Sequence, residues 1–219
     1  MSSKEGKAQS AEGLRPTLPL TPYSSRIYLA SRSPRRRELL QQLGVAFDEL
    51  LGADVDETPL AGEAADAYVL RLARAKAELG SHQVAARKLA ARPLLAADTT
   101  VVLEGEILGK PDDAEHAQSL LRRLSGKTHE VLTAVAVAQE GRVETALSVS
   151  TVEFRDLGDA EIRDYVASGE PLDKAGAYAI QGHAAIFVRA LSGSYSGIMG
   201  LPLLTTAELL RRFDIASNY

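Results

Sequence analysis

The feature that most constrains the fold is an apolar segment, residues 94–108, that is interrupted by an aspartate. Residues 94–97 are all apolar, Asp98 and Thr99 follow, and β-branched residues then resume. Such a run predicts a strand that is buried on both faces, where an unpaired carboxylate is costly. Asp98 therefore either caps or pairs locally, or belongs to a site that holds a metal ion and a phosphate. This segment alone leaves both interpretations open.

The same segment predicts a β-hairpin. Residues 104–106 form the turn between arms at 101–103 and 107–108, and the central glycine of the turn supplies a permissive backbone. The second arm runs into Lys110. We expect the base of this hairpin to bring Lys110 close to Asp98, which would place a cation for a phosphate beside a carboxylate for a metal.

The first ordered elements are predicted to be a strand at residues 26–30 and a helix with Ser33 as its N-cap and Pro34 at its first position. The first turn of this helix carries three consecutive arginines, residues 35–37. Positive charge there opposes the helix dipole, at a cost of a few tenths of a kcal/mol each, roughly. Free backbone N–H groups and guanidinium groups together describe a phosphate site. The alternative is a basic turn that is solvated or paired with carboxylates.

The next segments add further charged candidates. A strand is expected at residues 45–51, followed by an acidic loop at 54–59 whose carboxylates suit a hard divalent cation. A helix is expected at 64–79, and Lys76 lies on its apolar face. A lysine in that position either extends to solvent or points into a site. Residues 81–92 are expected to form a polar link with helical propensity that leads to the central strand.

The second half of the chain predicts helices, antiparallel strands and one long loop. The loop at residues 169–182 is rich in Gly, Asp and Lys, and a loop of this length in a compact domain favours function. Early alternation of strands and helices followed by antiparallel pairs predicts an α/β fold with a mixed sheet flanked by helices. The expected elements are a helix from an Asp112 cap to Leu124, strands at 130–138 and 142–154, a helix at 159–167, a strand at 185–190, a small-residue loop at 193–197 and a helix from 201 to about Phe213.

The composition excludes several functional classes. The absence of cysteine rules out disulfides, thiolate zinc sites and cysteine nucleophiles. A net charge of −4 gives no reason to expect nucleic-acid binding. No long apolar run suggests a membrane segment, so we expect a cytoplasmic protein. Residues 1–25 are predicted to be a disordered leader, and residues 26–214 a single domain.

Several motifs occur in order between Ile27 and Phe213. They are Ser31-x-Ser33-Pro34-Arg35-Arg36-x-Glu38-Leu39-Leu40, Ala97-Asp98-Thr99, Leu108-Gly109-Lys110-Pro111, Leu124-Ser125-Gly126-x-x-His129, the loop 169–178, Ile180-Gln181-Gly182 and Gly200-Leu201-Pro202. Together they resemble the signatures of the Maf family of nucleotide pyrophosphatases, and only the leader lies outside the resemblance. Arg32 and Ala179 depart from the usual family residues.

The resemblance implies a two-lobed α/β fold similar to that of inosine triphosphatases, with an active site in the cleft and a homodimeric assembly. It also implies metal-dependent hydrolysis of a nucleoside triphosphate to the monophosphate and pyrophosphate. Arg35, Thr99 and Gln181 match the residues of the dTTP/UTP branch of the family. Thr99 and Gln181 would then satisfy the carbonyl and imide N–H groups of a pyrimidine.

The candidate residues fit such a reaction. Ser33, Arg35 and Arg36 would hold the triphosphate, and Lys76 and Lys110 would offset charge on the leaving group. Glu57 and Asp98 are the candidate metal ligands, and Mg²⁺ or Mn²⁺ is favoured by all-oxygen ligation. By resemblance, Asp98 accepts a proton from the attacking water, although it could instead act purely as a metal ligand.

Other functions remain open at this point. A non-enzymatic regulator of septum formation is one alternative attached to the same family. A nucleic-acid-binding module is another, against which the acidic charge and the lack of a basic stripe argue. A closer enzymatic alternative is the removal of modified pyrimidine triphosphates by the same chemistry.

Overall fold

The computed structural model describes residues 26–50 and 54–215, and their centre is a mixed sheet of seven strands. The strand order is β2-β1-β3-β5-β6-β7, and β4 pairs with β3 beside this path. Strands β1, β2 and β3 are parallel, whereas β3 to β7 pair antiparallel, which confirms the predicted mixed sheet. The strands are β1 (Ile27–Ala30), β2 (Phe47–Leu50), β3 (Leu94–Leu103), β4 (Glu106–Leu108), β5 (Thr128–Gln139), β6 (Arg142–Phe154) and β7 (Val188–Ser192).

Strand β3 is the predicted central strand, and nearly all of its residues are buried. It lies between the parallel strand β1 and the antiparallel strand β5. The predicted hairpin to β4 is present. Its two turn residues, Glu104 and Gly105, have φ values of 53° and 84°, the positive values that a tight two-residue turn between twisted strands requires.

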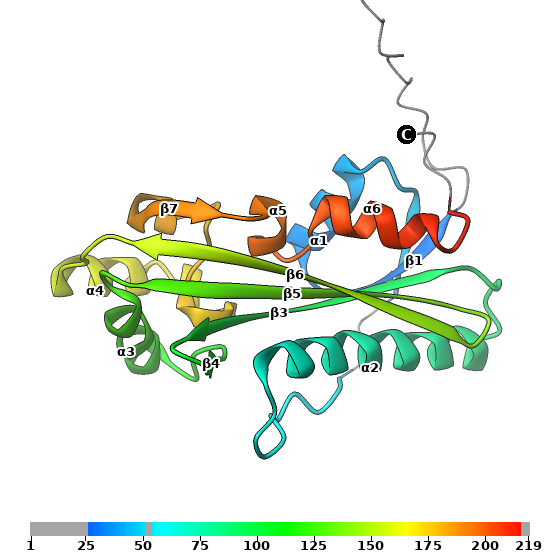
Figure 1. Ribbon diagram of the computed structural model, residues 1–219, viewed down its shortest axis with the longest axis horizontal. Coiled ribbons are helices and arrows are strands. Elements are labelled where there is room, and N and C mark those ends of the chain that lie inside the picture. Colours follow the sequence, from blue (N-terminus) through cyan, green and yellow to red (C-terminus); the bar gives the residue numbers. More distant parts are fainter. Residues whose placement is uncertain (1–25, 51–53, 216–219) are drawn as a thin grey trace, which may run out of the picture.

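Helices cover both faces of the sheet (Figure 1). Helices α1 (Pro34–Gln42) and α6 (Leu203–Arg211) lie on one face, and the long helix α2 (Ala65–Ala86) lies on the other. Helices α3 (Ala114–Leu124) and α4 (Asp159–Ala167) pack together at the end of the sheet where β5 begins and β6 ends. None of the helices in the described part of the chain combines the length and the hydropathy needed to cross a membrane.

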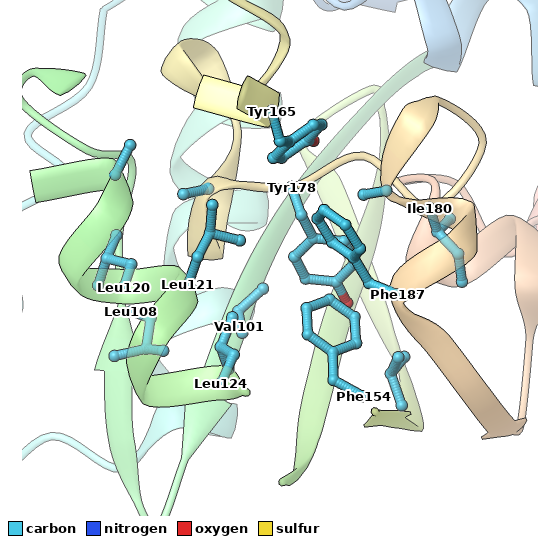
Figure 2. Close-up of a cluster of buried hydrophobic side chains, with 14 of the residues drawn as sticks. Val101, Leu108, Leu120, Leu121, Leu124, Phe154, Tyr165, Tyr178, Ile180 and Phe187 are labelled. Carbon is cyan, nitrogen blue, oxygen red and sulfur yellow. The ribbon is translucent and has the colours of Figure 1, made fainter. Parts of the chain in front are cut away.

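Helices α3 and α4 pack on a separate hydrophobic cluster, which forms the core of a second lobe (Figure 2). Aromatic rings form its centre: the centroids of Phe154 and Tyr178 are 4.9 Å apart, and those of Tyr165 and Phe187 are 5.0 Å apart. Both pairs adopt the edge-to-face arrangement that aromatic quadrupoles favour. Strands β3, β5 and β6 contribute to the cores of both lobes, so the two are joined by continuous sheet.

Three elements differ from the predicted ones by more than a shift of one or two residues at an end. Helix α2 continues to Ala86 through residues expected to form a polar link, because the helical propensity of that stretch prevails. The strand expected at 185–190 begins only at Val188, since a 3₁₀ helix, η3 (His183–Phe187), precedes it. Residues 195–197 of the expected small-residue loop belong to a short helix, α5 (Tyr195–Ile198).

The predicted N-cap of α3 is wrong by one residue. The Asp113 carboxylate accepts a hydrogen bond of 2.8 Å from the backbone N–H of His116, which is the N-cap contact. Asp112 lies outside the helix and is exposed, and its Oδ2 is 3.1 Å from Nδ1 of His116. The leader at 1–25 lies outside the described residues.

The cap assignment predicts different effects for these two neighbouring aspartates. Asp113→Ala should lower the free energy of unfolding by about 1 kcal/mol, because the N–H of His116 loses its partner. Asp112→Ala should change it by no more than about 0.5 kcal/mol, as expected for an exposed contact. Urea denaturation of both variants at pH 7 measures the difference. Equal losses in the two variants would contradict this assignment.

Candidate active site

A cleft of about 620 Å³ opens between the start of α1, the centre of β3 and the loop at residues 169–182. This volume is in the range of small-molecule sites. Every site residue predicted from the sequence lines the cleft. These residues are Ser33, Arg35, Arg36, Glu57, Lys76, Asp98, Thr99, Lys110 and Gln181.

The floor of the cleft is a charged triplet from three separate segments. Lys76 Nζ lies 2.6 Å from Asp98 Oδ1 and 2.6 Å from Glu57 Oε1. Lys76 therefore points from α2 into the site and does not extend to solvent. Asp98 is only 7% exposed, and its partner comes from a helix 22 residues earlier in the chain, so the interpretation as a local cap or pair is wrong.

The electrostatics of the triplet favour the charged form of Glu57. Burial raises the pKa of Glu57, but the hydrogen bond and charge of Lys76 outweigh it and hold the pKa below its ordinary value. Lys110 and Arg36 act on this pKa in the same direction, so both cations lie within electrostatic range of Glu57. Lys110 and Asp98 line the same cleft, although no direct contact between them is present among the described residues.

The three arginines of α1 have three different environments. Arg37 pairs with Glu49 at 3.1 Å, as the carboxylate-paired alternative expected. Arg36 enters the cleft, where Nε donates to Gly200 O at 2.8 Å and Nη2 donates to Thr99 Oγ1 at 3.1 Å. Arg35 also lines the cleft. The arginine cluster therefore divides between a surface ion pair and the site.

Within ranges 26–50 and 54–215, neither Arg35 nor Arg36 has a carboxylate in hydrogen-bond contact. Burial lowers the pKa of both groups, and the charges of Asp173 at Arg35 and of Asp98 at Arg36 oppose this effect. Arg35 Nε is buried and has no hydrogen-bond partner among the described residues. Buried donors of this kind are normally satisfied, so the arrangement favours a bound anion. At the start of the helix, Ser33 Oγ accepts from Arg36 N at 3.4 Å, as predicted for the cap.

The loop at residues 169–182 forms the opposite wall of the cleft and includes two short 3₁₀ helices, η1 (Glu170–Asp173) and η2 (Ala175–Ala177). The carboxylate of Glu170 fixes its two ends together: Oε1 accepts from Tyr165 OH at 2.9 Å, and Oε2 accepts from His183 N at 3.1 Å. A Cβ at Gly182 would lie 2.3 Å from this carboxylate, so a larger residue there would displace the Glu170 side chain. The neighbouring Gln181 is exposed at the cleft wall.

A second contact sets this loop against the sheet. Gly176 N donates to Gly109 O at 3.0 Å, which joins the loop to the end of the β-hairpin beside Lys110. Gly176 has a φ of 66°, and a Cβ there would approach Val101 to 2.9 Å. The close approach explains why small residues dominate this part of the loop.

Three further residues of the cleft bear on its charge or hydrogen bonding, although they were not among the predicted site residues. Lys174 lines the cleft and pairs with Asp173, and its place in the predicted functional loop could have indicated it. The Tyr68 hydroxyl donates to Glu57 O at 2.9 Å, and burial raises its pKa to about 12. The sequence position of Tyr68, on an amphipathic helix, gives no indication that this residue belongs to the site. Arg32, at the mouth, pairs with the exposed Asp54 at 3.1 Å.

A buried histidine supports the wall of the cleft from behind. His129 is 2% exposed, and its Nε2 lies 2.9 Å from the hydroxyl of Tyr178, a residue that lines the cleft. Its Nδ1 has no partner among the described residues. Burial lowers the pKa of His129 to about 4, so the ring is neutral at pH 7.

The fold and the cleft together define a class: an α/β protein with a cleft in which the buried Asp98, the exposed Glu57 and several cationic side chains meet. Comparison with known families narrows the class, because residues 26–213 match the family described as Maf-like protein. The chain belongs to this family, as the motifs indicated.

Curated relatives agree over most of their length. The dTTP/UTP pyrophosphatase of Aromatoleum aromaticum is 55% identical over 202 residues, which are 89% of this chain and 98% of that protein. The dTTP/UTP pyrophosphatase of Dechloromonas aromatica is 57% identical over 194 residues, 85% of this chain and 96% of that protein. Among solved structures, a HAM1 protein from Coxiella burnetii is a distant neighbour, with 19% identity, a TM-score of 0.45 and coverage of 86% of this chain and 99% of that one.

The lowered pKa of His129 predicts a loss of stability in acid. The unfolded chain takes up a proton near pH 6.5 and the folded chain only near pH 4, so folding is weakened as the pH falls through this window. Between pH 7 and pH 5 the contribution should be about 2 kcal/mol, from about 1.4 kcal/mol per pKa unit. Urea denaturation should therefore show a smaller loss between pH 7 and pH 5 in His129→Gln than in the parent. The exposed His82, changed to Gln, is the control and should retain the parent's full loss.

Proposed function

We propose that this protein is a nucleoside triphosphate pyrophosphatase that hydrolyses dTTP and UTP to the monophosphate and pyrophosphate, with Mg²⁺ or Mn²⁺ as cofactor. The observation that carries the proposal is the triplet in the cleft, where Lys76 bridges the buried Asp98 and the exposed Glu57. Beside it lie Arg35 and Arg36, which form no ion pair with a carboxylate of the described residues. The names of the relatives at 52–57% identity supply the reaction and the bases.

In the proposed reaction, water attacks the α-phosphorus, and the bond from this phosphorus to the α,β-bridging oxygen breaks. The water oxygen stays on the monophosphate, its proton passes to the carboxylate of Asp98, and pyrophosphate leaves with the bridging oxygen. Negative charge grows on both sides of the broken bond, so fixed cations stabilise the transition state more than the ground state. Asp98 suits the role of acceptor because it is buried, charged and held at one oxygen by Lys76.

The cations of the cleft divide this work. Arg36 and the N-terminus of α1, capped by Ser33, would hold the triphosphate, since a helix N-terminus and a guanidinium both favour phosphate oxygens. Lys76 and Lys110 would offset the charge of the leaving pyrophosphate. Lys174, on the facing loop, adds a further cation to the same cleft.

The donor set fits a magnesium or manganese ion. Mg²⁺ in proteins is commonly bound by one or two carboxylates together with substrate phosphates and waters. Glu57 and Asp98 provide two carboxylates that contact one atom, Lys76 Nζ, and no group of three or more His, Cys, Asp or Glu ligands occurs in ranges 26–50 and 54–215. When bound there, the cation would neutralise phosphate charge and polarise the reacting phosphoryl group.

Base selection is proposed to come from the end of the cleft near the 169–182 loop. Arg35 lies within electrostatic range of Glu170 and Asp173 of this loop, and Gln181 lines the same wall. The amide of Gln181 can both donate to a pyrimidine carbonyl and accept from the imide N–H. Thr99 stays the third predicted specificity residue, although its hydroxyl already accepts from Arg36.

Modified pyrimidine triphosphates would undergo the same chemistry and remain within this proposal. A homodimer, implied by the family resemblance, and a cytoplasmic location, expected from the sequence, are also part of it. No feature of the cleft favours the alternative of a non-enzymatic regulator of septum formation, which would need none of these buried charges.

The proposal predicts selective release of pyrophosphate from dTTP and UTP. With Mg²⁺ or Mn²⁺ present, turnover of these two should exceed that of CTP, GTP, ITP and 7-methyl-GTP. Asp98→Asn should lower kcat by at least about a hundredfold, in line with the loss of a general base, while thermal unfolding shows that the variant is folded. A folded parent that releases pyrophosphate from none of these nucleotides would overturn the proposal and favour the regulator.

Neighbouring arginines provide a matched test of the phosphate site. Arg36→Ala should lower kcat/KM for every accepted triphosphate by about a hundredfold, because a charge-assisted contact worth roughly 1.5–3 kcal/mol is lost. Arg37→Ala removes the same charge from the ion pair with Glu49 and should change kcat/KM less than about twofold. Steady-state kinetics with dTTP and UTP compare the two. If both variants behave alike, Arg36 does not bind phosphate.

A further inference from the structure

Behind the cleft, three hydroxyl side chains stand in one row across neighbouring strands. Thr99 of β3 is paired in register with Thr133 of β5, which is paired in turn with Ser148 of β6. Thr133 is fully buried and lies within an otherwise apolar stretch of β5. It is not among the residues that line the cleft. A hydroxyl buried this deeply is retained at a cost unless hydrogen bonds compensate it.

The direction of each hydrogen bond in this row follows from the chemistry of its ends. Arg36 can only donate, so Thr99 Oγ1 accepts from it at 3.1 Å. The Thr133 hydroxyl is the donor in the other two contacts, and its single hydrogen is shared between two acceptors within reach, Gly197 O at 2.8 Å and Thr99 Oγ1 at 3.0 Å.

These bonds close into a ring through the turn after α5. Gly200 N donates to Gly197 O at 2.9 Å, and Gly200 O accepts from Arg36 Nε at 2.8 Å. The ring thus passes through Arg36, Thr99, Thr133, Gly197 and Gly200 and returns to the guanidinium. Gly200 has a φ of 112°, which accounts for the glycine at this position of the ring.

We infer that Thr133 is a positioning residue that orients the guanidinium of Arg36 toward the triphosphate. The inference rests on the proposed function. The ring occupies Nε and one Nη2 hydrogen of Arg36 and leaves its other donors for the ligand. Thr99 is the link between Thr133 and Arg36, so the hydroxyl of Thr99 serves phosphate binding as well as any contact with the base. Loss of Thr133 should therefore weaken the handling of all triphosphates alike.

Thr133→Val tests this inference, because it keeps the shape of the side chain and removes only the hydroxyl. We expect kcat/KM to fall about tenfold for both dTTP and UTP, equivalent to about 1.4 kcal/mol for a lost buried hydrogen bond. The ratio between the two nucleotides should not change. Thr133→Ser keeps the hydroxyl and should recover activity to within about threefold.

A matched variant separates positioning from simple stability. Thr206 is another fully buried threonine, but its Oγ1 has no hydrogen-bond partner among the described residues. Thr206→Val should leave kcat/KM within about twofold of the parent. Thermal unfolding of each variant identifies any loss of fold. A Thr133→Val variant that is folded and as active as the parent would overturn the inference.

Two further measurements test whether Thr133 acts through Arg36 and whether its effect on ligand binding is seen without nucleotide hydrolysis. In the Arg36→Ala background, Thr133→Val should cause no additional loss, whereas an independent structural role would give the same tenfold loss in both backgrounds. Calorimetric binding of inorganic tripolyphosphate needs no hydrolysis. Its affinity should fall about tenfold in Thr133→Val and not in Thr133→Ser, even if the parent hydrolyses no nucleotide. Unchanged affinity would sink the inference whatever the outcome for the proposed function.

Discussion

The contact on which the rest of the structure depends is the bridge from Lys76 to Asp98 and Glu57. Asp98 interrupts the central strand β3, nearly all of whose residues are buried, and a carboxylate there needs a fixed cation close by. Helix α2 supplies that cation from the face that also packs Leu72 and Ala73 against the sheet. The same packing that buries α2 therefore places Lys76 beside the two carboxylates of the cleft. The position of this helix determines both the core and the site.

Strands β3 and β5 support the opposite wall of the site, which the loop at 169–182 forms. Strands β3 and β5 pass from one hydrophobic cluster to the next, and the loop at 169–182 is tied to them by the contact of Gly176 with Gly109 O. Behind that loop lie His129 and the aromatic rings of the second lobe. The wall that carries Gln181 thus rests on a packed core, as precise binding requires.

Periodicity and capping predicted most of the elements, because these signals are local. Ser33 and Pro34 begin α1 as expected, and the apolar run around Asp98 is the central strand. The misplaced elements depended on tertiary contacts. Asp112 and Asp113 are equivalent in sequence, and only the path of the chain decides which one caps α3. The candidate residues were found by motif. Thr133 was not, because in the sequence it is an ordinary strand residue, and only the register of β3 and β5 shows that it lies beside Thr99.

The choice of partners for Arg36 explains how one buried cation can be both fixed and available. A carboxylate would hold the guanidinium firmly but would neutralise it and compete with phosphate, as Glu49 does for Arg37 at the surface. Its hydrogen-bond partners in the cleft are instead a carbonyl and a hydroxyl, which define orientation without cancelling charge. Burial lowers the pKa of Arg36, yet a guanidinium starts so far above neutrality that it stays charged. A lysine in this place would be more easily deprotonated and would lack the planar fork that two fixed acceptors can orient. The neutral ring behind the cleft is thus the arrangement that keeps a positive charge directed at the ligand.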